Sequence, residues 1–120
     1  MDLRLFDVAM AAIYLCSRWD GDRDGEFRCD KCELFFGAYQ QQLCRSAGLE
    51  PLIPDERKLL PKMLDMANIY LIHWEVSTYM DTFGADDDEY LAYLKHSIRL
   101  MHWLGAHRAE VIKTIARALG

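Results

Sequence analysis

Apolar residues recur at helical spacing along the whole chain, and this periodicity most limits what the chain can fold into. It runs through five stretches, near residues 5–18, 30–47, 54–84, 86–105 and 107–119. Side chains three or four positions apart share one face of an α-helix, so each stretch predicts a helix with an apolar face. No stretch alternates apolar and polar residues over the length of a strand, and no internal repeat divides the chain. We therefore predict an all-α fold, an irregular bundle of about five helices that residues 1–120 form as a single domain.

Residues that favour helix starts and stops separate these stretches. Asp30 and Glu33 have the spacing of a capping box, which predicts a helix start there, and Gly48 fits a left-handed stop. Pro54, followed by two acidic residues, fits the first turn of the third helix. Pro61 cannot donate a hydrogen bond to the carbonyl oxygen four residues earlier, so this long helix is expected to kink or to restart there. Because it is apolar on nearly every side, we expect it to be central.

Charge and hydropathy limit the partners of the chain. Its formal net charge of -5 repels a phosphate backbone, and no basic stripe offsets that charge, so nucleic acid is not an expected partner. The longest uncharged apolar stretch near the start, residues 8–16, is much shorter than the roughly 20 residues of a membrane-spanning helix. The residues before it do not resemble the start of a signal peptide. We therefore expect no membrane partner and a cytoplasmic location.

An acidic loop follows the first predicted helix. Asp20, Asp22 and Asp24 stand at the first, third and fifth positions, and Gly25 stands at the sixth, as at the start of an EF-hand calcium loop. The twelfth position, which supplies a bidentate carboxylate in such loops, is Lys31. The alternative is a solvated connector, because Asp and Gly are common in turns. The sequence is compatible with both a calcium site and a solvated connector in this loop.

The four cysteines could bind a metal or simply pack. Without a secretory signal we expect reduced thiols in Cys16, Cys29, Cys32 and Cys44. Cys29 and Cys32 have the spacing of half a zinc site, which Cys16 and Cys44 could complete. Alternatively, Cys29 and Cys32 are small apolar residues beside a helix start. His96, His102 and His107 lack the spacing of a helical zinc protease, and no Ser or Cys lies in a nucleophile signature, so motifs alone predict no active site.

Polar and amphipathic residues interrupt the apolar third helix and could line a binding pocket. Steps of four, three and four residues bring one set to a common face: Tyr70, Trp74, Ser77 and Asp81. Aromatic faces attract cations and carboxylates pair with ammonium groups, so this face predicts a site for a small amino- or hydroxyl-bearing substrate. In the alternative interpretation these aromatic residues belong to the core. Glu75 and His73 lie off the face and are expected to be satisfied within the bundle.

Several segments resemble one family of enzymes. The sequence Asp-Leu-Arg-Leu-Phe-Asp-Val-Ala at residues 2–9 resembles the segment just after the metal-binding Asp of aminoglycoside phosphotransferases and homoserine-kinase-type enzymes. Residues 35–39, 54–61 and 103–108 resemble later helices of the same family. The chain thus resembles, over nearly its whole length, the C-terminal helical subdomain of these kinase-like enzymes.

The resemblance implies a substrate-binding helical portion of a small-molecule phosphotransferase. The nucleotide lobe, the His-x-Asp-x-x-x-x-Asn loop and the metal-binding Asp of such enzymes would precede Met1, so no catalytic residue is assigned and this chain alone is expected to be inactive. ATP and magnesium are expected only with a catalytic lobe, and we expect this chain alone to bind no cofactor. Asp7 would be a structural anchor. Expected partners are a catalytic half or a second copy. The alternatives are a non-enzymatic dimerisation module and a small metal-binding domain.

Overall fold

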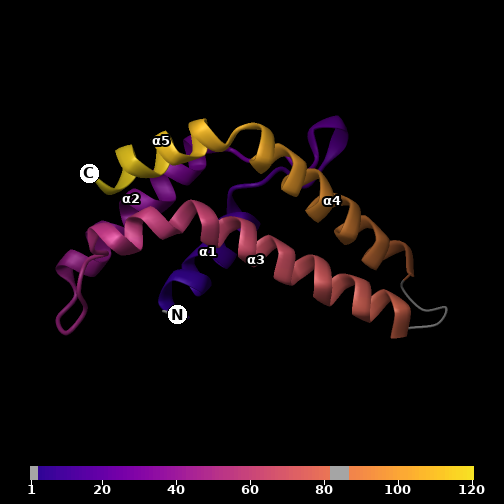
Figure 1. Ribbon diagram of the computed structural model, residues 1–120, viewed down its shortest axis with the longest axis horizontal. Helices are drawn as coiled ribbons and strands as arrows, with labels where there is room; N and C mark the ends of the chain where they lie inside the picture. The colour runs from indigo at the N-terminus through magenta and orange to yellow at the C-terminus, as the bar shows by residue number, and fades with distance from the viewer. Residues whose placement is uncertain (1–2, 82–86) are drawn as a thin grey trace.

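The helical periodicity of the sequence appears directly in the fold. The computed structural model describes residues 3–81 and 87–120 and places them in five α-helices (Figure 1). The helices are α1 (Leu3–Leu15), α2 (Cys29–Arg45), α3 (Pro54–Asp81), α4 (Asp87–Ala106) and α5 (Arg108–Leu119). Within the described ranges, the strand-like pairing is limited to an antiparallel bridge between Ser17 and Phe27. The predicted all-α bundle of about five helices is confirmed.

Two of the predicted helix ends are wrong because other interactions compete for the same groups. α1 ends at Leu15 and not near Arg18, since the backbone N–H of Arg18 donates to the carbonyl of Glu26 (2.9 Å). α2 begins at Cys29, and the carboxylate of Asp30 pairs with Arg28 (2.8 Å) instead of capping the helix. The expected capping box therefore does not form.

The glycines at the predicted ends of the second and fourth helices have different outcomes. Gly48 has the predicted left-handed backbone, with φ of 81°, three residues beyond the end of α2. Gly105 does not stop α4, which continues through it to Ala106. Glycine costs roughly 1 kcal/mol inside a helix, and packing along the rest of the helix can outweigh that cost. The predicted end of the third helix near Gly84 lies outside the described residues.

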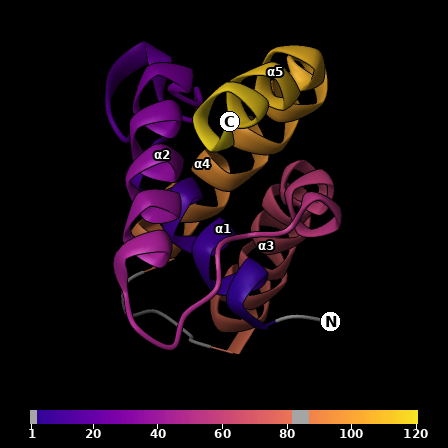
Figure 2. The same cartoon turned by 90° about the vertical axis from the view of Figure 1, so that its left-hand side faces the viewer.

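α3 is the central element, as its sequence predicts. It packs against α1, α4 and α5, and Figure 2 shows α1 lying between α2 and α3. At a rise of 1.5 Å per residue its 28 residues span about 42 Å, most of the 48 Å length of the molecule. The helix is continuous across Pro61, and its axis bends between its two halves (Figure 1).

The core lies where α1, α2, α3 and α5 meet the C-terminal half of α4. Ala9 and Ala12 are fully buried in α1 and let neighbouring helices approach closely. Larger core side chains fill the space around them: Leu5, Ile13, Phe36, Leu60, Leu64, Leu100, Leu104, Val111 and Ile115. The core occupies the end of the molecule away from the α3–α4 connection. The second half of α3 lies farther from this core, and it carries Trp74, Glu75 and Ser77.

Candidate functional site

An aromatic pocket opens between α1, α3 and α4. Its volume is about 320 Å³, at the small end of the range of small-molecule sites. Five of its seven lining side chains are aromatic: the residues are Tyr14, Trp19, Leu71, Trp74, Glu75, Tyr90 and Tyr93. We call this cavity the aromatic pocket. The faces and edges of these rings surround one carboxylate.

Glu75 is the acidic residue of the aromatic pocket, and only one of its two oxygens is hydrogen-bonded. The side chain is 8% exposed, and the hydroxyl of Ser97 donates to Oε1 (3.0 Å). Oε2 is buried and has no hydrogen-bond partner in the part of the chain that the structure describes. Burial raises the pKa of Glu75, and the Ser97 hydrogen bond partly opposes this rise. An ionised carboxylate here is therefore costly until a cation or a donor joins it.

Trp19 forms one wall of the aromatic pocket and is held from both sides. Its indole Nε1 donates to the backbone carbonyl of Tyr14 (2.9 Å), and its ring stacks on the ring of His96 with centroids 3.6 Å apart. Tyr93 meets the same indole edge-on at 6.3 Å. The wall is thus fixed before any ligand arrives, which lowers the ordering cost of binding.

His96 connects this wall to two polar side chains. Its Nδ1 lies 2.9 Å from Oδ1 of Asp24, and its Nε2 lies 3.1 Å from Oγ of Ser17. The arrangement resembles a Ser-His-Asp triad, but Ser17 uses its one proton to bond the carbonyl of Ile13 (2.6 Å). That proton is therefore directed at Ile13 and not at His96, so the geometry does not activate Ser17 as a nucleophile. Ser17 is buried and does not line the aromatic pocket, so the network supports the Trp19 wall.

Of the four residues predicted to bind substrate, the structure places one in the aromatic pocket. Trp74 lines the aromatic pocket and is 54% exposed. Tyr70 and Ser77 are exposed but do not line it, and the Tyr70 ring packs edge-on against Phe6 at 5.5 Å. Asp81 ends α3, and its side chain lies outside the described residues. The pocket uses the neighbouring face of α3, and sequence reasoning missed Glu75 because that residue lies off the Tyr70 face.

Asp7 does not line the aromatic pocket. It is exposed on α1, beside a cleft that Arg4, Phe35 and Tyr39 also line. Arg4 forms a 2.8 Å ion pair with Glu56 at the start of α3. This pair ties the N-terminal helix to the first turn of the central one. The anchoring role that the resemblance implies for Asp7 stays a prediction.

The acidic loop and the cysteines do not come together as a metal site in the described part of the chain. Asp20 and Asp22 are exposed, whereas Asp24 turns toward His96 and toward Arg99 (3.5 Å). Cys16 and Cys32 are buried and Cys44 is exposed; burial raises the pKa of Cys16 to about 11. Among residues 3–81 and 87–120, no three His, Cys, Asp or Glu side chains converge as metal ligands. The calcium and zinc interpretations gain no support from this geometry.

Comparison with known proteins adds no assignment. No family model matches the chain, and neither a curated protein nor a solved structure does. None of the described helices combines the length and the apolar character that crossing a membrane requires. The geometry of the site is therefore the basis for a functional proposal.

Proposed function

We propose that this chain binds a small molecule bearing an ammonium group in the aromatic pocket. The observation that carries the proposal is the buried Oε2 of Glu75, an acceptor to which no described residue donates, in a cavity whose other walls are mostly aromatic. Buried polar atoms are nearly always hydrogen-bonded, and exceptions concentrate at functional sites. An ammonium group supplies both the missing donor and the compensating charge.

The aromatic rings suit the rest of such a ligand. Indole and phenol faces attract cations by roughly 0.5–2 kcal/mol, more as water is excluded. Trp19 and Trp74 present two indoles to the cavity, and Leu71 adds an apolar surface for the carbon skeleton. A neutral or anionic ligand would leave Glu75 uncompensated. The aromatic pocket therefore favours an aliphatic amine over an alcohol of the same shape.

The resemblance to kinase-like phosphotransferases would make this pocket part of an acceptor-substrate site. On that interpretation the chain supplies recognition of an amino- or hydroxyl-bearing substrate, and ATP with magnesium would bind a separate catalytic lobe. This chain has no residue assigned to phosphoryl transfer. Its proposed activity is therefore binding.

A matched pair of ligands tests the binding proposal by calorimetry. We expect 3-methylbutylammonium to bind at least about tenfold more tightly than 3-methylbutan-1-ol, because a hydrogen bond to a charged partner contributes about 1.5–3 kcal/mol. Trp74→Ala should weaken the ammonium ligand by roughly two- to thirtyfold through loss of a cation–π wall. Tyr70→Ala is the control, since Tyr70 is an equally exposed aromatic of α3 outside the pocket. Equal affinity for the two ligands, or equal losses in the two variants, would contradict the proposal.

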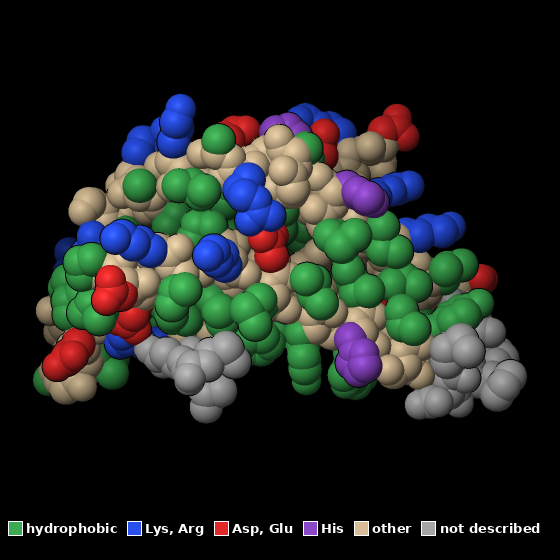
Figure 3. Space-filling model, viewed as in Figure 1, with side chains coloured by type: hydrophobic (Ala, Val, Ile, Leu, Met, Phe, Trp, Pro, Cys, Tyr) green, Lys and Arg blue, Asp and Glu red, His purple; other side chains and the backbone are tan. Residues whose placement is uncertain are grey.

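An exposed apolar face of α3 supports a second candidate function, self-association. Leu59, Met66 and Ile69 are each about half exposed, at 47%, 48% and 55%, and helical spacing puts them in one line. Figure 3 shows hydrophobic side chains gathered over α3 on the face of the molecule that it presents. Contiguous exposed apolar surface of this kind often marks an interface.

Sedimentation velocity at several concentrations tests this second candidate. We expect the wild-type chain to associate as its concentration rises, and we expect Met66→Lys with Ile69→Lys to remain monomeric, because charged residues are depleted from interface cores. The exposed pair Ala47→Lys with Ala106→Lys controls for added charge. A wild-type chain that stays monomeric at every concentration would rule out self-association through this face.

A further inference from the structure

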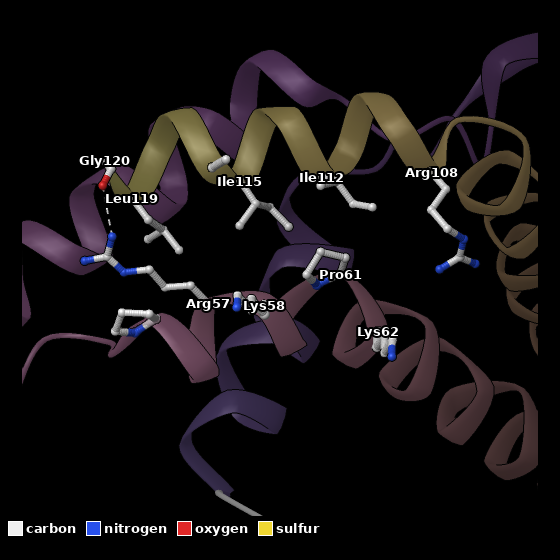
Figure 4. Close-up of a pocket in the computed structure, with 11 residues that line it drawn as sticks. Arg57, Lys58, Pro61, Lys62, Arg108, Ile112, Ile115, Leu119 and Gly120 are labelled. Carbon is white, nitrogen blue, oxygen red and sulfur yellow. Dashed lines mark hydrogen bonds between the residues drawn. The ribbon is translucent and has the colours of Figure 1, made fainter.

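A second cavity, which we call the cationic groove, runs between α3 and α5 on the side of the core away from the aromatic pocket. Its volume is about 420 Å³. Figure 4 shows Pro61 of α3 and Ile112, Ile115 and Leu119 of α5 pointing into the space between the two helices. Ile112 is 47% exposed, so part of this apolar wall meets solvent.

All the charged residues that line the cationic groove are basic, although the chain as a whole carries a net charge of -5. They are Arg57, Lys58, Lys62 and Arg108. Figure 3 shows Lys and Arg side chains along the boundary of α3 and α5. The groove is therefore a local reversal of the overall charge.

Two carboxylates of α3 near this groove are paired with arginines, one of which, Arg108, is itself a groove residue. Glu56 pairs with Arg4 at 2.8 Å, and Asp65 pairs with Arg108 at 2.7 Å. Lys58 and Lys62 lie one helical turn apart and form no ion pair with any described residue. Like charges at this spacing repel each other, and an anion placed between them would relieve the repulsion.

The shape of the groove favours a single extended chain over a partner helix. It extends along α5 from Arg108 to Gly120, where the guanidinium of Arg57 donates to the Gly120 carbonyl (3.0 Å). Its volume of about 420 Å³ falls within the range of small-molecule sites, roughly 300–1,000 Å³. A helix about 10–12 Å across with its side chains needs a far wider groove.

We propose that the cationic groove binds an aliphatic carboxylate. The hydrocarbon chain would lie against Pro61, Ile112 and Leu119, and the carboxylate would meet Lys58 and Lys62 at the open edge. Apolar walls and a basic rim complement the two ends of such a molecule. This inference does not depend on the aromatic pocket, which lies elsewhere and carries a carboxylate.

Octanoate and 1-octanol are the probes, and calorimetry measures their affinities. We expect octanoate to bind more tightly than the alcohol. Lys58→Gln with Lys62→Gln should weaken octanoate by roughly two- to thirtyfold and leave 1-octanol unchanged, because each of the two exposed charge pairs contributes about 0.2–1 kcal/mol. The exposed pair Lys95→Gln with Lys113→Gln, which lies outside the groove, removes the same total charge and should change neither affinity.

A second variant separates the apolar wall from the charge. Ile112→Glu should weaken both probes by about tenfold or more, since it places a solvated anion in the hydrocarbon path. Ile98→Glu, at an exposed isoleucine of α4, is its control. The proposal is overturned if octanoate does not bind, if it binds no better than 1-octanol, or if the lysine pair can be replaced without loss. Binding of 3-methylbutylammonium should be unchanged in every groove variant, which keeps this test distinct from that of the aromatic pocket.

Discussion

Replacement of Gly25 by alanine should destabilise the fold by roughly 2–5 kcal/mol. Gly25 has φ of 86°, a left-handed backbone that costs a residue with a Cβ about 1–2 kcal/mol. It is also buried against α4, where an added Cβ would overlap Cβ of Arg99 and lie 3.1 Å from the backbone nitrogen of Leu100. Overpacking of this kind costs a further 1–3 kcal/mol or so.

Gly21 is the matched control for this measurement. It has a similar backbone, with φ of 68°, but nothing lies within 4 Å of the position of an added Cβ. Gly21→Ala should therefore lose only the backbone part, about 1–2 kcal/mol. Urea unfolding of both variants measures the difference. Equal losses would show that the loop does not approach α4 as closely as the structure has it.

The close approach of Gly25 could not be read from the sequence. There it is the sixth position of a calcium-type loop, and a turn explains a glycine at that place equally well. The structure shows that the absence of a side chain lets the loop reach α4, which brings Asp24 to His96. The two residues are 72 positions apart, and Ser17 is 79 positions from His96. Local spacing carries no information about such contacts.

The helices themselves follow from local pattern, and so they could be predicted. Apolar spacing identifies α5 from Val111, Ile115 and Leu119 without any knowledge of what it packs against. The helix ends were harder, because the cap expected from Asp30 competes with an ion pair to Arg28. The capping pattern takes no account of an ion pair between residues only two positions apart.

Only part of the aromatic pocket could be predicted from the sequence. Trp74 was a candidate because it interrupts an apolar helix, but its partners come from α1, the following loop and α4. The sequence of α3 alone does not show which of its two adjacent faces another helix covers. Glu75 was expected to be satisfied inside the bundle, and Ser97 of α4 does bond one of its oxygens. The unbonded second oxygen became apparent only from the packing.

Replacement of Glu75 by glutamine should have opposite effects on stability and on binding. Burial raises the pKa of Glu75 above its ordinary value of 4.5, so the folded state favours the protonated form. The stability gained from this shift is present below pH 4.5 and is lost as the pH rises through the raised pKa. At neutral pH Glu75→Gln should therefore be at least as stable as the wild type in urea unfolding. Glutamine can still accept the hydrogen bond from Ser97.

The groups that face Glu75 determine how its titration can be measured. Tyr14 comes from α1, Tyr90, Tyr93 and Ser97 come from α4, and His96 lies behind the Trp19 wall. The pKa of Tyr14 is raised, first by burial and then by the charge of Glu75. Tyr14 therefore stays neutral in weak acid. Any pH dependence that remains in Glu75→Gln belongs to groups other than Glu75.

Calorimetric titration of 3-methylbutylammonium into the wild type and into Glu75→Gln, from about pH 8 down to the ordinary Glu pKa of 4.5, tests the central claim most directly. An alkylammonium keeps its charge throughout this range, as lysine does with a pKa of about 10.4. We predict that Glu75→Gln weakens binding about thirtyfold or more at neutral pH, since loss of one partner of a buried charge pair costs about 2 kcal/mol or more. We also predict that wild-type affinity falls as the pH falls and that the variant shows no such fall. A variant that binds the ammonium ligand as tightly as the wild type, with the same pH profile, would contradict the account.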